Sequence, residues 1–182
     1  DAVFSGESEK TFVDFLHQRL AKRGNNESKQ SDLIFGRPAT RMDEIPTPSF
    51  AEYESQLKEW LPDSPHAGED AQWIPYETSR GCWWGERSHC TFCGLNGNGM
   101  NFRAKSPDRV VAELRVLTAG RRRSLIAMTD NIMPHGYFEN LLPRIESEFP
   151  GVHLFYEEKA NLSLKNIDSL VKAGVKEVQL GI

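Results

Sequence analysis

Residues 106–128 read SPDRVVAELRVLTAGRRRSLIAM, and this stretch decides the fold class. Its opening Ser-Pro-Asp predicts a helix, because Ser106 is a favourable N-cap and proline suits the first helical turn. Apolar residues then recur at spacings of three and four as far as Gly120, which is expected to end the helix. The buried face of this helix is expected to consist of Val110, Val111, Leu114 and Leu117. The apolar run over 124–128 follows as a short strand.

The same alternation extends on both sides of this stretch. Residues 72–78 have strand character, and Pro143 is expected to kink or split the helical segment that contains it. The elements expected downstream are a helix over 136–149, a strand over 153–156, a helix over 164–173 and a strand over 177–180. The helix over 164–173 carries Ile167, Leu170 and Val171 and is expected to end at Gly174. The alternation predicts an α/β fold with a parallel sheet, part of a (β/α) barrel or of a doubly wound sheet, with ligands at the carboxyl ends of the strands.

The first 71 residues are more polar and indicate two helices separated by linkers. Residues 7–23 have the spacing of a helix, with an apolar face formed by Phe12, Phe15, Leu16 and Leu20. Residues 24–71 are typical of a linker that contains one short helix over 49–61, because polar residues, glycine and proline dominate the rest. The chain opens and closes on strand-like residues, and parallel strands need neighbours. We therefore expect a fragment of a longer protein.

Composition narrows the class of protein. With 38% hydrophobic and 26% charged residues, the 182-residue chain can bury a core and is not disordered as a whole. No apolar run approaches the ~20 residues that span a bilayer, and no leader is visible, so we expect a cytoplasmic protein without a membrane partner. The net charge of −4 argues against nucleic acid as the main partner.

All three cysteines lie between positions 82 and 93, in the loop that follows the strand over 72–78. An odd number of closely spaced cysteines is a poor disulfide framework and suggests one metal site in a reducing compartment. The two-residue gap between Cys90 and Cys93 lets two thiolates bind one metal centre, and Cys82 approaches from upstream. Structural zinc sites and ferredoxin-type clusters require four ligands. Three cysteines on a four-iron cluster leave one iron open to a substrate or cofactor, which favours a catalytic cluster.

The sequence around the cysteines resembles a known family. Residues 77–85 read ETSRGCWWG, and residues 88–97 read SHCTFCGLNG. They resemble the cobalamin-type branch of the radical S-adenosylmethionine superfamily, whose members mature ribosomally made, bacteriocin-like peptides. That branch combines a double tryptophan with a longer first cysteine gap than the common superfamily pattern has. By this resemblance, residues 72–182 are the N-terminal part of a radical S-adenosylmethionine barrel, and residues 1–23 are the C-terminal helix of a truncated cobalamin-binding domain.

The resemblance implies a set of cofactors and partners. Cys82, Cys90 and Cys93 would hold a four-iron four-sulfur cluster, and S-adenosylmethionine would chelate its open iron. An electron from a donor such as flavodoxin or ferredoxin would cleave S-adenosylmethionine to a 5′-deoxyadenosyl radical. This radical would abstract a hydrogen atom from a precursor peptide, and methylcobalamin would deliver a methyl group to the carbon radical. The cofactors carry this chemistry, and the protein positions them.

The resemblance also implies contacts with S-adenosylmethionine outside the cluster. Phe92 is expected against the adenine ring. Thr129, Asp130 and Asn131 follow the second strand of the series, where the family has a Gly-Gly-Glu type motif for the amino group of the methionine moiety. Lys159 ends the third strand and is expected to pair with the methionine carboxylate.

Other interpretations of the same residues stay open. Completed by His89, the cysteines could form a structural zinc site in a module that binds a partner or nucleic acid through Arg121–Arg123. They could also form a plain electron-transfer iron–sulfur domain. Asp130 fits a helix cap as well as a ligand contact, and Trp83 and Trp84 fit a packing role. As part of a barrel, the isolated chain is expected to show little or no turnover.

Overall fold

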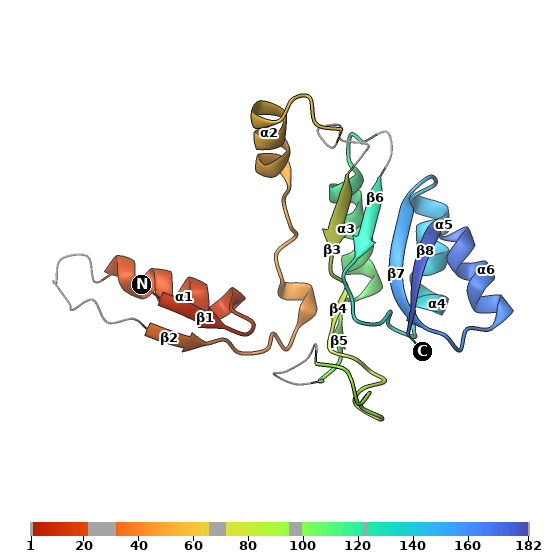
Figure 1. Ribbon diagram of the computed structural model, residues 1–182, viewed down its shortest axis with the longest axis horizontal. Helices are drawn as coiled ribbons and strands as arrows, with labels where there is room; N and C mark the ends of the chain where they lie inside the picture. Colours follow the sequence, from red (N-terminus) through yellow and green to blue (C-terminus); the bar gives the residue numbers. More distant parts are fainter. Residues whose placement is uncertain (1, 22–31, 66–71, 95–99, 122–123, 182) are drawn as a thin grey trace. The chain divides into compact units, whose positions relative to one another are not determined.

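The computed structural model describes residues 2–21, 32–65, 72–94, 100–121 and 124–181 (Figure 1). The chain divides into two compact units, residues 1–45 and residues 46–182. The cysteines and the elements of the expected α/β series all belong to the second unit.

The first unit contains a small strand–helix–strand motif. Its elements are β1 (Ala2–Ser5), α1 (Glu9–Ala21), β2 (Asp32–Phe35) and a 3₁₀ helix (Met42–Glu44). β1 and β2 pair in parallel, with Phe4 opposite Ile34. The ring of Phe4 meets the rings of Phe12 and Phe15 edge-on, each at 5.4 Å between centroids, and so packs the helix on the strand. The helix expected within 7–23 is confirmed.

The segment expected as a linker holds more structure than the sequence indicated. β2 lies inside the range 24–71, so that expectation is corrected at residues 32–35. The reason is that its short apolar run becomes a strand by pairing with β1, far earlier in the chain. The short helix is confirmed as α2 (Ala51–Trp60). Two further parts of the expected linker, 24–31 and 66–71, lie outside the described residues.

The second unit is built on a four-stranded parallel sheet. Its strands are β3 (Trp73–Tyr76), β6 (Leu125–Met128), β7 (His153–Lys159) and β8 (Val175–Gly181). Its further helices are α3 (Pro107–Thr118), α4 (Tyr137–Asn140), α5 (Leu142–Glu148) and α6 (Leu164–Lys172). The strands pair in the order β3-β6-β7-β8, and every pair is parallel. The predicted α/β class with a parallel sheet is confirmed.

The helices that connect these strands pack on one face of the sheet (Figure 1). Right-handed crossovers between successive neighbours lead to this arrangement. The fully buried members of the core include Tyr76, Val110, Leu114, Ile126, Leu142, Leu154 and Tyr156. Within the described residues the strand order does not reverse, whereas a doubly wound sheet has a reversal. The order is compatible with part of a barrel, and closure of a barrel stays a prediction.

The helix boundaries follow local signals in the sequence. Ser106 caps α3, because its hydroxyl accepts a hydrogen bond from the backbone N–H of Arg109 at 3.2 Å. All four residues expected on the buried face of α3 are buried. Pro143 stands in the first turn of α5, and the segment is divided into two short helices, as predicted.

Two elements near the end of the chain show features that the sequence did not predict. Of the three apolar residues that the predicted helix carries, only Leu170 is buried in α6, whereas Ile167 and Val171 are 44% and 56% exposed. The reason is that α6 lies next to β8, the edge strand of the described sheet, and the described residues include no further helix to cover its outer flank. β7 runs beyond its expected end and brings Lys159 into the sheet, opposite Gly181.

Candidate functional site

The cysteine loop, residues 81–102, is closed by a short antiparallel stem. Within this loop, 95–99 lie outside the described part of the chain. The stem consists of β4 (Ser79–Arg80) and β5 (Arg103–Ala104), which pair antiparallel. The backbone N–H of Cys82 donates to the carbonyl of Met100 at 3.2 Å and continues the stem. The first cysteine is therefore tied to the sheet through the stem.

Gly81 is required at the start of the cysteine loop. Its φ of +80° lies in the left-handed region, which glycine adopts without steric cost. A Cβ atom at this position would lie 2.3 Å from the carbonyl oxygen of Asn101 on the returning strand. The stem can therefore close in this form only with glycine here.

The three cysteines are half-buried, and none of them forms a disulfide. The Sγ of Cys82 accepts a hydrogen bond from the backbone N–H of Gly85 at 3.3 Å. The backbone N–H of Cys93 donates to the carbonyl of Cys90 at 3.1 Å. Among the described residues, no three His, Cys, Asp or Glu side chains are arranged to hold a metal ion. His89, the fourth ligand of the zinc alternative, is exposed.

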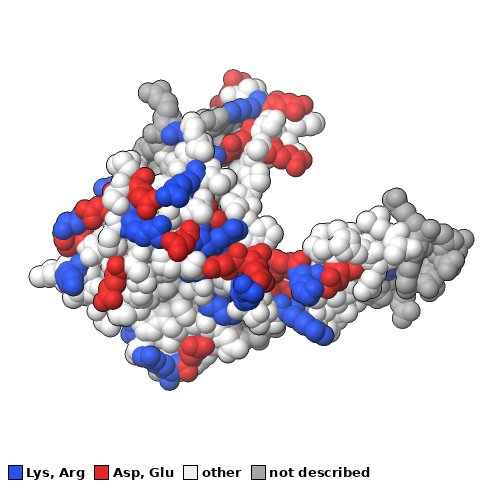
Figure 2. All heavy atoms as spheres, turned by 180° about the vertical axis from the view of Figure 1, so that it is seen from behind, with Lys and Arg blue, Asp and Glu red and all other residues white. Residues whose placement is uncertain are grey.

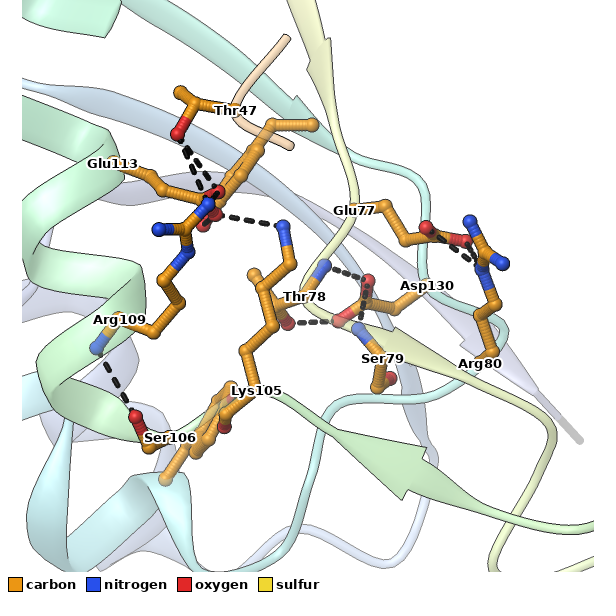
Figure 3. A network of polar contacts seen from close by, with 12 residues as sticks. Thr47, Glu77, Thr78, Ser79, Arg80, Lys105, Ser106, Arg109, Glu113 and Asp130 are labelled. Atoms are coloured by element: carbon orange, nitrogen blue, oxygen red, sulfur yellow. Dashed lines mark hydrogen bonds and ion pairs between the residues drawn. The ribbon is translucent and has the colours of Figure 1, made fainter. Parts of the chain in front are cut away.

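Asp130 lies at the base of the stem and is fully buried (Figure 3). Its Oδ1 accepts hydrogen bonds from the backbone N–H groups of Thr78 at 2.7 Å and Ser79 at 2.9 Å. Its Oδ2 lies against the Thr78 hydroxyl. Burial raises the pKa of Asp130 to about 6, although these hydrogen bonds act in the opposite direction. Asp130 thus holds the backbone that enters the cysteine loop, and its contact with S-adenosylmethionine stays a prediction.

Residues 130–133, which we call the clamp, also bind the stem and the start of the cysteine loop through two backbone carbonyls. The hydroxyl of Ser79 donates to the carbonyl of Ile132 at 3.3 Å. The indole N–H of Trp83 donates to the carbonyl of Met133 at 3.0 Å. These two hydrogen bonds lie on either side of Cys82 in the sequence. They therefore attach the start of the cysteine loop to the segment that follows β6.

The other two residues predicted around Asp130 differ in their contacts. Asn131 donates its side-chain amide to the carbonyl of Gly81 at 3.5 Å, at the start of the cysteine loop. Thr129 is exposed at the end of β6. Gly136 is the N-cap of the next helix, α4, so Asp130 does not cap it. The structure therefore brings Asp130 and Asn131 to the stem.

Lys159 reaches the cysteine loop from the third strand of the sheet. Its Nζ lies 3.7 Å from the centroid of the Trp84 ring, a close cation–π contact. Along β7 it alternates with the buried Tyr156 and Glu158, so it lies on the sheet face opposite the helices. The end of β7 thus contacts the cysteine loop that follows β3, and the contact of Lys159 with the methionine carboxylate stays a prediction. Phe92, in contrast, is 82% exposed.

Two carboxyl groups beside Lys159 were missed from the sequence. Glu158 is buried, and its Oε1 accepts a hydrogen bond from the backbone N–H of Lys159 at 2.8 Å. Its Oε2 has no hydrogen-bond partner among the residues that the structure describes. Burial raises the pKa of Glu158 and also that of Glu157. The sequence feature that could have revealed these carboxyl groups is the run of consecutive charged residues in a strand, because one of their side chains has to point inward.

A second buried network was also missed (Figure 3). Glu113 on α3 pairs with Lys105 at 2.6 Å and with Arg109 at 2.7 Å, and it accepts a hydrogen bond from the Tyr76 hydroxyl. Burial alone would raise the pKa of Glu113, but the hydrogen bonds and charges of these partners hold it below its usual value. Because the backbone N–H of Lys105 donates to the carbonyl of Thr78 at 2.8 Å, this network anchors the other strand of the stem. The sequence feature that could have revealed this network is a glutamate on the apolar face of the predicted helix.

Surface features bear on the classes of partner. Arg121 forms an ion pair with Glu54, and 122–123 lie outside the described residues. Figure 2 shows basic and acidic side chains intermixed on the back of the second unit. Oppositely charged side chains of this unit also form ion pairs, such as Arg144 with Asp108 at 2.7 Å. Nucleic-acid surfaces have clustered basic residues, so this face gives no support to that alternative. In the described ranges, none of the helices combines the length and the apolar character that crossing a bilayer needs.

The donor chemistry of the loop fits an iron–sulfur cluster, although the three described thiols do not converge. Thiolates are the ligands that iron–sulfur clusters use, and metal ligands commonly come together only when the metal binds. No protein-family model matches the chain, and no curated protein matches it.

Proposed function

We propose that this chain is part of a radical S-adenosylmethionine enzyme that C-methylates a ribosomally made peptide. The observation that supports this most directly is the meeting of a three-cysteine loop with the carboxyl edge of a parallel sheet. The loop contacts the sheet through its stem after β3, the clamp after β6 and Lys159 on β7. Ligand sites of α/β folds lie at this edge.

In this proposal Cys82, Cys90 and Cys93 hold a four-iron four-sulfur cluster with one open iron. When bound together with S-adenosylmethionine, the cluster supplies the electron that cleaves the sulfonium. Cys82 lies next to the stem, and its N–H bonds across the loop to Met100, whereas Cys90 and Cys93 lie further along the loop. The loop therefore has one cysteine at an anchored end and two that adjust when the cluster binds.

The remaining contacts are assigned to side chains at the same edge. Lys159 offers a charge-assisted hydrogen bond to the methionine carboxylate, and its contact with Trp84 restricts its position. Thr129 and Asn131 offer a hydroxyl and an amide to the amino group. The exposed ring of Phe92 is available to stack on the adenine.

The proposal includes partners beyond these residues. The strand–helix–strand motif of the first unit is compatible with the end of a cobalamin-binding domain, and methylcobalamin would supply the methyl group. A flavodoxin or ferredoxin would supply the electron, and the substrate would be a precursor peptide. Unprotected thiols that ligate iron suit the reducing cytoplasm.

Anaerobic reconstitution with iron and sulfide tests the proposal. We expect the wild type to bind about four iron ions per chain. After reduction, its EPR spectrum is expected to change when S-adenosylmethionine is added. Cys90→Ala is expected to lose the cluster while it keeps the far-UV circular dichroism spectrum of the wild type. Ser88→Ala, at an exposed position of the same loop, is the matched control and is expected to keep the cluster.

The other outcomes separate the alternatives. Normal iron content in Cys90→Ala would contradict the assignment of the ligands. A colourless protein with stoichiometric zinc would favour the structural module. A cluster whose spectrum does not respond to S-adenosylmethionine would favour plain electron transfer.

A further inference from the structure

We infer that Asp130 is a positioning residue for the cysteine loop, and that with the carbonyls of Ile132 and Met133 it sets the place of Cys82 relative to the sheet. This inference rests on the proposed function only in treating Cys82 as a metal ligand. The contacts that carry it lie within the protein and involve no metal.

The first step is the convergence of two backbone donors on one oxygen. The parallel pairing of β3 with β6 ends at Tyr76 and Met128. Thr78 and Ser79 then lead from β3 into the antiparallel stem. Their buried N–H groups still need acceptors, and Oδ1 of Asp130 accepts both. Asp130 therefore replaces the strand partner at the point where the chain turns toward the cysteines.

The second step leads from the clamp to the thiol. The Ser79 hydroxyl and the Trp83 indole donate to the carbonyls of the clamp, and these two residues bracket Cys82 in the sequence. The N–H of Cys82 donates across the stem to Met100. Anchored on both sides, Cys82 has little freedom to move with the rest of the loop. Asp130 acts on it through the backbone.

The test measures the reactivity of the thiols in the metal-free, reduced full-length chain. Iodoacetamide labelling followed by mass spectrometry gives the ratio of the labelling rates of Cys82 and Cys93. We expect Asp130→Ala to raise this ratio at least about tenfold, the effect of losing a hydrogen bond to a charged group. Asp130→Asn is expected to keep the ratio within about twofold, because its amide oxygen still accepts both backbone N–H groups.

A matched control separates positioning from general destabilisation. Ile145→Ala removes a fully buried core side chain on α5 and is expected to leave the ratio unchanged. Trp83→Phe removes the indole N–H donor and leaves a smaller aromatic ring, and it is expected to raise the ratio several-fold. It therefore tests the anchoring of Cys82 by the clamp if Asp130→Ala does not fold. Backbone amide exchange at Ser79 is expected to rise in parallel in Asp130→Ala.

The results that overturn the inference are distinct from those that overturn the proposed function. An unchanged ratio in folded Asp130→Ala, or in Trp83→Phe, would overturn the inference, and so would an equal rise in Ile145→Ala. Failure of the wild type to assemble a cluster, with these ratios as expected, would overturn the proposed function alone.

Discussion

At the scale of single residues, Asp130 combines a perturbed pKa with a structural task. Its Oδ1 accepts two backbone N–H groups in either protonation state, because a proton on the carboxyl group can reside on Oδ2. That oxygen faces the Thr78 hydroxyl, which can donate to a carboxylate or accept from a carboxylic acid. Asp130 therefore keeps its contacts with the stem on both sides of its pKa.

The raised pKa of Asp130 predicts a pH dependence of stability. Because the folded chain holds this proton more tightly than the unfolded chain, the stabilisation is present below about pH 4 and is lost as the pH rises through about 6. The loss amounts to about 3 kcal/mol for about two pKa units. Urea unfolding of the wild type and of Asp130→Asn, from pH 4 to pH 7, measures this contribution. The stability of the wild type relative to the variant is expected to fall over that range.

The comparison with Asp130→Asn removes the effect of other carboxyl groups. Burial raises the pKa of Glu157 and Glu158, so their contribution to stability also falls as the pH rises. The pKa of Glu113 is lowered, so its contribution to stability increases as the pH rises. These groups are present in both proteins and cancel in the difference. A difference that stays constant with pH would show that Asp130 does not titrate in this range.

Glu113 and Lys105 form a buried ion pair that also has a structural role. Each is almost fully buried, and the removal of Glu113 leaves the charge of Lys105 without this ion pair, which costs about 3–5 kcal/mol. The pair thus makes β3, α3 and the return strand of the stem depend on one another.

At the scale of elements, the two-residue strands β4 and β5 are too short to be stable alone. They persist because Asp130 holds one strand and the network of Glu113 holds the other. A small ladder with two buried anchors therefore presents a long loop at the edge of the sheet.

Gly81→Ala is expected to open this stem. The left-handed φ alone costs about 1–2 kcal/mol for alanine, and the approach to the Asn101 carbonyl adds to it. Thermal unfolding is expected to show a lowered midpoint, and iron binding after reconstitution is expected to weaken. Gly94→Ala is the control in the same loop, because no atom of the described residues outside its chain neighbours lies within 4 Å of the added Cβ. Equal midpoints for the two variants would refute the proposed requirement for glycine.

At the scale of the whole molecule, the second unit contains its own core. All members of its buried cluster lie between Ile74 and Val175, and the partly buried Phe50 packs against them. The cysteine loop and both anchors of its stem also lie within residues 46–182. The candidate site is therefore carried by one unit.

A chain of residues 46–182 is accordingly expected to fold without the first unit. Its urea unfolding is expected to be cooperative, with a free energy of unfolding close to that of the same transition in the full chain. The labelling ratio of Cys82 and Cys93 is expected to match that of the full chain. A shortened chain that lacks a cooperative transition would show that the first unit stabilises the second.

Much of the fold was predictable because its signals are local. The Ser106 cap, the break at Pro143 and the apolar spacing of α3 each depend on residues within a few positions. The strand that was missed, β2, depends on a partner far away in the sequence. The exposure of Ile167 was missed because the helical spacing shows only that a face is apolar and does not show what covers it.

The strand–helix alternation of residues 72–182, their parallel sheet and the position of three thiols after a strand could all be predicted from the amino-acid sequence. The inward position of Asp130 at the stem, the contact of Lys159 with Trp84 and the anchoring of the return strand by a buried glutamate became apparent only in the folded chain. Backbone preferences and capping act between near neighbours, so they can be read along the chain. The partner of a buried polar group depends on which distant segment the folded chain brings within hydrogen-bonding distance.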